Sequence, residues 1–147
     1  MTTTMLGESL FIRNHVNELR RMSRWLSECA AALNIPTTEA FNLDVCANEA
    51  VLNIINYSYD DSEHHEITLE LSSTNECARL IIRDDGKPFN PLNWPAHQAV
   101  RRIEDACVGG LGIHLMRHLL SRCDYRRISG SNELILEARR TPPRGNA

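Results

Sequence analysis

The alternation of apolar and polar residues predicts one strand and two helices in the first half of the chain. Residues 8–13 have the pattern of a short edge strand. Apolar residues then recur at steps of three and four over residues 15–34, which indicates a helix with one buried stripe. Thr37 and Thr38 follow a proline and predict a hydroxyl cap for a second helix, which reaches about Tyr57.

The second half is predicted to contain two hairpins and one further helix. Residues 66–73 and 77–85 are rich in β-forming side chains around a turn-like stretch, which indicates an antiparallel hairpin. Helical periodicity returns over residues 109–122, and residues 123–139 predict a second hairpin. Between the hairpins, residues 97–106 indicate a short, weakly apolar surface helix after a stretch rich in Gly, Pro and Asn.

This order of elements decides the fold class. Consecutive strands that pair as hairpins are incompatible with a doubly wound parallel sheet that has helices on both faces. We therefore expect an α/β fold, a two-layer sandwich with a mixed, largely antiparallel sheet in one layer and helices in the other. Residues 1–147 are expected to form a single domain with a core over about 8–140 and a frayed tail at 141–147.

Composition and charge narrow the classes of function. The chain has 147 residues, of which 42% are apolar and 24% charged, which suits one globular domain. Sixteen Lys and Arg against nineteen Asp and Glu give a net charge of -3, so no basic surplus favours nucleic acid or an anionic membrane. No apolar run approaches the ~18 residues of a membrane span, and the N-terminus lacks signal-peptide features, so we expect a cytoplasmic protein.

Cysteines and histidines give no sign of a metal centre. The five cysteines are spread along the chain without a CxxC pair, which is typical of reduced core thiols. His114 and His118 stand one helical turn apart, but the glutamate of a zinc-protease motif is missing between them. We interpret them as part of a solvated helix face.

The second helix carries a polar stripe that contains Glu49 and Asn53. These residues are four apart and project from one face. A carboxylate and a carboxamide at this spacing suit a hard cation bound through phosphates, because Mg²⁺ takes few protein oxygens and keeps its waters. A helix whose outer, polar face is simply exposed to solvent explains the same pattern. The polar stripe comprises Asn42, Cys46, Glu49, Asn53 and Asn56, beside an apolar stripe of Phe41, Val45, Leu52 and Ile55.

Asp84, Asp85 and Gly86 end the strand that precedes the glycine-rich loop. Asp-Gly is common hairpin chemistry, so a type I′ turn is one interpretation. However, the next predicted strand begins only at residue 123, which favours a turn that opens a pocket. Asp84 is then placed to accept a hydrogen bond from a group bound against the backbone of the glycine two residues later, which has no side chain.

A third motif, Gly109, Gly110, Leu111 and Gly112, stands directly before a predicted helix. Glycines let the backbone approach an anion, and the free N–H groups of the helix point at it. A plain glycine linker explains these residues equally well. The chain has no GxxxxGK[ST] and no GxGxxG motif, which excludes a Walker-type site and gives no sign of a dinucleotide.

In this order, the three motifs resemble the ATP-binding domain shared by histidine kinases, gyrase, Hsp90 and MutL. Over about residues 8–140 the sequence is similar to the small anti-sigma factor serine/threonine kinases of bacterial partner-switching systems. The motif Glu-Ala-x-x-Asn with a following aromatic is matched by Glu49, Ala50, Asn53 and Tyr57, and Asp-x-Gly-x-x-Phe is matched by Asp84, Gly86 and Phe89. The GGLG motif is matched by residues 109–112.

The resemblance implies a role for each matched residue. Asn53 would bind Mg²⁺ and Glu49 would act as the general base. Asp84 would accept the adenine amino group, within the motif completed by Gly86 and Phe89. The resemblance also implies phosphate contact by Gly109, Gly110, Leu111 and Gly112, and a lid formed by residues 90–108.

The first predicted helix has a further family-like motif, Asn-Glu-x-x-Arg, matched by Asn17, Glu18 and Arg21. Such kinases use this face for protein partners, although an ordinary solvated face fits the residues as well. Two positions depart from the family pattern. Val108 replaces a common acidic residue, and Ser131 or Asn132 stands where many relatives have the threonine of Gly-x-Thr, unless a weaker water-mediated contact serves instead.

The resemblance implies a kinase that uses Mg-ATP to phosphorylate a Ser or Thr of a STAS-type anti-sigma factor antagonist. A sigma factor is a second expected partner, and homodimerisation is expected at the family level only. The alternative is a non-catalytic, nucleotide-dependent module that sequesters a sigma factor or another regulator, and a simple ATPase is a third interpretation. Retention of Glu49 together with Asn53 favours the kinase, since a scaffold needs no base.

Overall fold

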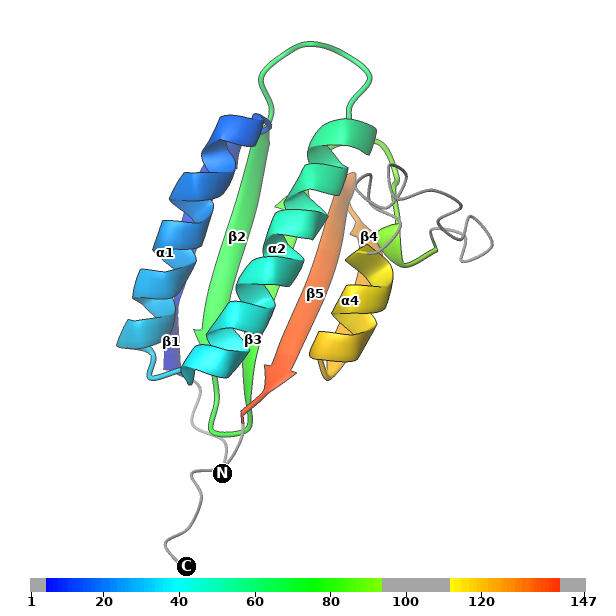
Figure 1. Ribbon diagram of the computed structural model, residues 1–147. Coiled ribbons are helices and arrows are strands. Elements are labelled where there is room, and N and C mark those ends of the chain that lie inside the picture. Colours follow the sequence, from blue (N-terminus) through cyan, green and yellow to red (C-terminus); the bar gives the residue numbers. More distant parts are fainter. Residues whose placement is uncertain (1–4, 94–111, 141–147) are drawn as a thin grey trace, which may run out of the picture.

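The computed structural model describes residues 5–93 and 112–140, which form a five-stranded sheet with helices along one face (Figure 1). The strands are β1 (Met5–Arg13), β2 (Glu66–Ser73), β3 (Cys77–Asp84), β4 (Arg122–Ile128) and β5 (Ser131–Arg139). The helices are α1 (Leu19–Ala32), α2 (Thr37–Tyr57) and α4 (Gly112–Leu119), with short 3₁₀ turns η1 (Val16–Glu18) and η2 (Pro91–Asn93).

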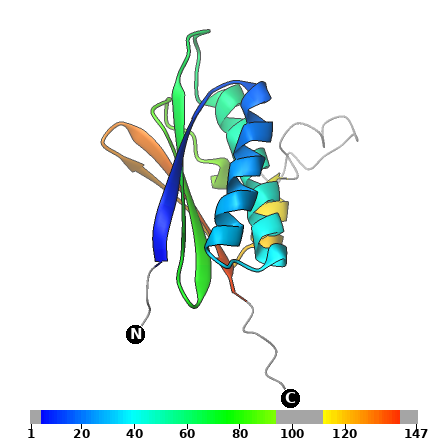
Figure 2. The same cartoon turned by 90° about the vertical axis from the view of Figure 1, so that its left-hand side faces the viewer.

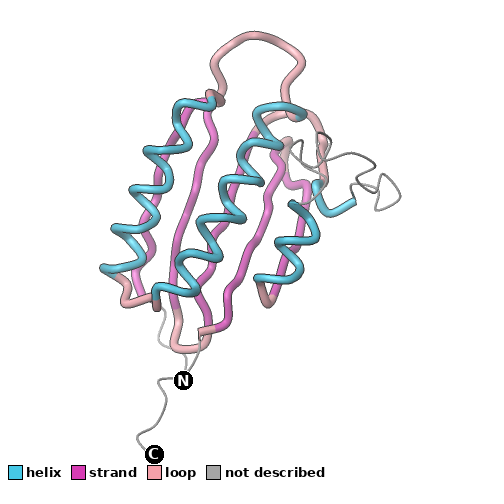
Figure 3. Tube along the Cα trace, in the orientation of Figure 1, coloured by secondary structure: helices cyan, strands magenta, loops and turns pink. Residues whose placement is uncertain are grey.

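The sheet has the order β1-β2-β3-β5-β4, and all four pairings are antiparallel. Both predicted hairpins are present, as β2–β3 and β4–β5. Figure 3 shows α1, α2 and α4 side by side across the sheet, and Figure 2 shows the other face free of helices among the described residues. The two-layer sandwich is therefore confirmed, and the sheet is antiparallel throughout its described strands.

The core lies between the helices and one face of the sheet. Alternate strand residues, such as Leu69, Leu80 and Leu136, are fully buried and point at the helix layer. Met22 of α1 and Val51 of α2 meet them from the other side and are equally inaccessible. Each such side chain contributes roughly 1.5–3 kcal/mol of burial free energy. This packing holds α2 against the sheet, beside the strand ends that carry the candidate site.

The predicted division of α2 into a polar and an apolar stripe is wrong. Phe41 is 65% exposed, whereas Cys46 and Asn53 of the polar stripe are buried. The reason is that α2 contacts α1 and α4 as well as β3 and β5, so it is covered over much of its circumference. Small residues, Ala47 and Ala50, lie on the side packed into the core.

The helix starts also differ from the predictions. The first helix begins with η1 and becomes α-helical only at Leu19. The predicted hydroxyl cap is not found, because Thr37 is already helical and Pro36 is the capping residue, with no side-chain hydrogen bond. The Pro36 carbonyl accepts the first helical bond from the Ala40 N–H at 3.0 Å, and its fixed φ of -57° suits this position.

The face of the sheet opposite the helices is covered by ion pairs. Glu133 of β5 lies between Arg83 and Arg126, and Glu137 of β5 lies between Arg79 and Arg122. Both glutamates are buried beneath the arginine side chains, at 5% and 9% exposure. The predicted surface helix 97–106 and residues 94–108 of the predicted lid lie outside the described residues.

Candidate functional site

Asp84 occupies the last position of β3 and is buried, with 4% exposure. Its Oδ1 accepts hydrogen bonds from Nδ2 of Asn132 at 2.9 Å and from the Gly86 N–H at 3.0 Å. Burial raises the pKa of the Asp84 carboxyl, and these two hydrogen bonds act in the opposite direction. No described residue bonds to Oδ2, so one carboxylate oxygen remains for a ligand.

Asn132 is the residue that sequence reasoning left undecided, and the structure places it directly across from Asp84 in the β3–β5 pairing. Its carbonyl oxygen accepts hydrogen bonds from the Tyr125 hydroxyl, from Nη1 of Arg127 at 3.1 Å and from the Phe89 N–H at 3.3 Å. These three donors identify the oxygen of the amide, so its NH₂ group must face Asp84. Of the two candidates for the family's threonine position, Asn132 is the one beside Asp84.

Gly86 is required by a close backbone approach. A Cβ on Gly86 would lie 2.3 Å from the Ser58 carbonyl oxygen and 2.7 Å from the Ser58 Cβ. The next residue, Lys87, donates its N–H to the same carbonyl at 2.8 Å. The loop after β3 is therefore held against the C-terminal end of α2, which brings the Asp84 motif to the helix that carries Glu49 and Asn53.

Phe89, in the loop after β3, packs against the C-terminal end of α2. Its ring stacks on Tyr57 of α2 with centroids 5.5 Å apart. A small cavity of about 10 Å³ lies between α2, β3 and β5, and Asp84, Phe89 and Asn132 are among its lining residues. Such a volume holds a single water molecule, so a purine ring enters only if the lining side chains move.

Glu49 and Asn53 lie one turn apart on α2, as predicted. Asn53 is 5% exposed, and its side chain has no hydrogen-bond partner among the described residues. Glu49 is half-buried, and burial raises the pKa of its carboxyl. Within the described part of the chain no cation pairs with Glu49, so this carboxylate is available to a ligand or substrate.

The glycine motif is described only in part. Gly109, Gly110 and Leu111 lie outside the described residues, and Gly112 is the first residue of α4. Further along α4, Met116 is fully buried while Leu115 is 38% exposed. His114 and His118 are exposed, which confirms their interpretation as a solvated face.

Glu18 and Arg21, the predicted partner residues, form an ion pair with each other at 2.8 Å. Both also bond to the backbone of β1, Glu18 to the Arg13 N–H and Arg21 to the Phe11 carbonyl. Hydrogen bonds from Arg21 and from the Arg13 backbone lower the pKa of Glu18 to about 2. About half of the Arg21 side chain remains exposed.

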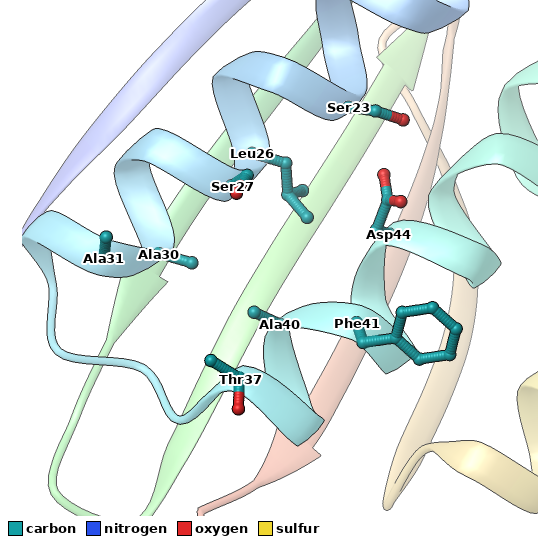
Figure 4. Close-up of a pocket in the computed structure, with 9 residues that line it drawn as sticks. All are labelled: Ser23, Leu26, Ser27, Ala30, Ala31, Thr37, Ala40, Phe41 and Asp44. Atoms are coloured by element: carbon teal, nitrogen blue, oxygen red, sulfur yellow. The ribbon is translucent and has the colours of Figure 1, made fainter.

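A larger cavity, of about 290 Å³, lies apart from these residues in the groove between α1 and α2 (Figure 4). Leu26, Ala30, Ala40 and the exposed Phe41 form its apolar part, and Asp44 lies at one end. None of the predicted site residues lines it. In the described ranges, no three His, Cys, Asp or Glu residues are grouped to hold a metal ion, and no helix has the length and hydropathy to cross a membrane.

The sequence matches the family described as the histidine kinase-like ATPase domain over residues 12–138. The chain therefore belongs to this family, and the family expected from the motifs is confirmed. A curated relative, the serine/threonine-protein kinase BtrW of Bordetella bronchiseptica, is 31% identical over 118 residues, which are 80% of this chain and 83% of BtrW. The chain and this serine/threonine-protein kinase are therefore relatives over most of the length of both.

Two solved structures share the fold. The RsbU and RsbW domains of Rv1364c from Mycobacterium tuberculosis align with a TM-score of 0.64 at 14% identity, over 95% of this chain and 34% of that one. The histidine kinase domain of a blue-light activated histidine kinase from Erythrobacter litoralis aligns with a TM-score of 0.52 at 16% identity, over 80% and 60% of the two chains. The chain thus spans about a third of the first protein and three fifths of the second.

Proposed function

We propose that the chain is an ATP-dependent serine/threonine protein kinase that phosphorylates a STAS-type anti-sigma factor antagonist, with a sigma factor as a second partner. The observation that carries the proposal is the pair on α2: a half-buried Glu49 carboxylate without a cationic partner in the described residues, one turn from the buried Asn53. The kinase name of the relative BtrW supports the same reaction class.

Phosphoryl transfer needs positioning and charge neutralisation more than covalent chemistry from the protein. Glu49 would accept the proton of the seryl or threonyl hydroxyl, and its raised pKa makes it a better base than an exposed glutamate. The donor set fits Mg²⁺, which binds through one or two protein oxygens and otherwise through phosphates and water. Asn53 would hold that ion by its side-chain oxygen, and the ion would neutralise phosphate charge.

Asp84 would recognise the nucleotide base. Asn132 and Gly86 hold its Oδ1, so the free Oδ2 can accept a hydrogen bond from the exocyclic amino group of adenine. Phe89 would then move aside to admit the ring. Gly109, Gly110, Leu111 and Gly112 would contact the phosphates, and Glu18 with the half-exposed Arg21 would meet the protein partner.

The experiment combines radiolabelled ATP, Mg²⁺ and an antagonist protein with four forms of the chain. The wild type should label the antagonist. Glu49→Gln should bind nucleotide with little change in Kd but lose transfer by about 10²–10⁴-fold, as removal of a general base does. Asp84→Asn should lose binding as measured by calorimetry. Glu28→Gln, a charge removal on the exposed surface of α1, should behave as wild type.

The outcomes separate the candidate functions. Nucleotide binding by the wild type without a labelled antagonist would favour the non-catalytic binding module. Undiminished transfer by Glu49→Gln would refute the assignment of the base while leaving kinase activity in place. No heat of binding with any adenine nucleotide would refute the nucleotide site itself.

A further inference from the structure

Arg127 lies at the end of a row of polar side chains that crosses three strands on the helix side of the sheet. In the strand register, Arg127 of β4 is opposite Asn132 of β5, and Asn132 is opposite Asp84 of β3. Side chains at directly opposed positions share one face of a sheet, and successive residues alternate between the faces. Arg126 therefore faces the other way, where it pairs with Glu133. The register thus places one of two consecutive arginines on the Asp84 side.

The Arg127 guanidinium bonds to two groups that surround Asp84. Its Nη1 donates to the Gly86 carbonyl at 2.7 Å and to Oδ1 of Asn132 at 3.1 Å. The Tyr125 hydroxyl donates to the same Asn132 oxygen. Gly86 and Asn132 are also the two donors to Oδ1 of Asp84, through the Gly86 N–H at 3.0 Å and Nδ2 of Asn132 at 2.9 Å. One guanidinium nitrogen therefore joins both donors of the buried carboxylate.

The charge of Arg127 acts on Asp84 in the same direction as these hydrogen bonds. Burial raises the pKa of the Asp84 carboxyl, and the carboxylate of Asp85 adds to this effect. The hydrogen bonds from Asn132 and Gly86 lower that pKa, and so does the positive charge of Arg127. Loss of the arginine would therefore favour the protonated form of Asp84.

Other titratable groups near Asp84 are bonded elsewhere in the described structure. The hydroxyl of Tyr59, in the loop after α2, donates to Oδ1 of Asp85 at 3.0 Å. The Lys87 ammonium pairs with a carboxylate of the same loop at 2.8 Å. Of the two cations, only Arg127 therefore bonds by its side chain to the residues that hold Asp84.

We propose that Arg127 is a positioning residue for recognition of the nucleotide base. It holds Gly86 and Asn132 so that both donate to Oδ1 of Asp84, which leaves Oδ2 as the acceptor for the exocyclic amino group of adenine. Its charge also favours the ionised form of that carboxylate, which is the form without a proton of its own. The inference rests on the nucleotide site proposed above and adds to it a residue that belongs to none of the sequence motifs.

The test compares the wild type with Arg127→Gln and Arg127→Lys. The matched control is Arg126→Gln, which removes the adjacent arginine of β4 on the opposite face of the sheet. The ionisation of Asp84 is followed in the nucleotide-free protein by the NMR signal of its carboxyl carbon as pH is varied. The Kd for ADP is measured by calorimetry over the same pH range.

In Arg127→Gln the Asp84 titration should move up by about one pH unit, because a neighbouring cation is lost. The pH below which ADP binding weakens should rise by the same amount. Arg127→Lys keeps the charge but not the planar guanidinium, so its titration should stay near that of the wild type. Its Kd for ADP should rise about three- to tenfold, as expected for a lost hydrogen bond. The Arg126→Gln control should match the wild type in both measurements.

An unchanged Asp84 titration in Arg127→Gln would overturn the proposal, as would an equal displacement in the Arg126→Gln control. If Arg127→Gln does not fold, Arg127→Lys decides the matter, because a wild-type Kd for ADP in that variant would contradict positioning by the guanidinium. Absence of ADP binding by the wild type would instead refute the nucleotide site itself. A wild type that binds ADP beside an Arg127→Gln variant with the same Kd at every pH would refute only the role of Arg127.

Discussion

The side chain of Asn132 donates a hydrogen bond to the buried carboxylate of Asp84 across the β3–β5 pair, at 2.9 Å. The Asn132 amide cannot flip so as to exchange its oxygen and nitrogen, because its oxygen already accepts hydrogen bonds from Tyr125, Arg127 and the Phe89 backbone. Its second N–H bond goes to the Lys87 carbonyl at 2.8 Å. One amide therefore joins β3, β4, β5 and the loop after β3 around the carboxylate proposed to read the nucleotide.

Replacement of Asn132 by leucine should destabilise the protein by about 1–3 kcal/mol, because the Lys87 carbonyl loses its side-chain donor and the buried Asp84 carboxylate keeps only the Gly86 N–H. Asn132→Thr, which introduces the threonine of the Gly-x-Thr motif and keeps a hydroxyl donor, should lose less. Urea unfolding of the three proteins measures both effects. Equal stability of Asn132→Leu and the wild type would show that the amide network adds nothing to the folded state.

Gly86→Ala should be more damaging than Gly130→Ala. At Gly86 a methyl group would clash with the Ser58 backbone at 2.3 Å, so the loop must leave the end of α2, at a cost of about 1–3 kcal/mol. At Gly130 nothing lies within 4 Å, and only the positive φ of 81° opposes alanine, which costs about 1–2 kcal/mol. Only Gly86→Ala should also weaken nucleotide binding, which calorimetry would detect.

The pH dependence of transfer should report the ionisation of Glu49. Burial raises the pKa of this carboxyl above 4.5, and a general base acts only when ionised, so the rate should fall as pH drops through the raised pKa. A pH–rate profile measures this acidic limb. Glu49→Gln should show no such limb in its residual activity, and a limb at an unchanged pH in that variant would assign it to another group.

Stability supplies an independent readout for the same residue, with the opposite sign. A raised pKa in the folded state means that the protonated form is favoured by folding, so this contribution is present below pH 4.5 and is lost as pH rises through the folded pKa. Glu49→Gln should therefore be at least as stable as the wild type at pH 7 in urea unfolding.

The arrangement of elements could be predicted from the sequence, because hairpin spacing and helical periodicity act locally. Strand β3 and helix α2 were placed within a residue by such patterns. The burial of α2 could not be predicted in this way. Phe41 is exposed and Asn53 is buried because α1, α4 and the sheet surround the helix, and none of those contacts is encoded in the period of α2 itself.

The candidate site shows the same difference between what local patterns predict and what depends on contacts between distant elements. Asp84, Gly86, Glu49 and Asn53 could be proposed as site residues from the sequence because each belongs to a short motif. The position of Asn132 depends on the register between β3 and β5, which joins residues 48 apart in the chain, so the sequence left two candidates for it. The hydrogen bond from the Arg13 N–H to Glu18 could not be predicted for the same reason, since a helix motif does not show which strand backbone its side chains will contact.

The ion pairs on the helix-free face should make unequal contributions to stability. Glu133 is 5% exposed and is bonded to both Arg83 and Arg126, whereas Asp124 and its partner Arg122 are each about half exposed. Glu133→Gln should therefore cost about 1.5–3 kcal/mol at pH 7, and Asp124→Asn less than about 1 kcal/mol.

Burial would raise the pKa of Glu133, but the hydrogen bonds from Arg83 and Arg126 outweigh it and hold the pKa below its usual value. A lowered folded pKa contributes stability above pH 4.5 that is lost as pH falls, so the difference between Glu133→Gln and the wild type should shrink when urea unfolding is repeated at pH 3. A difference that is the same at both pH values would mean that the carboxylate charge is not what Glu133 contributes.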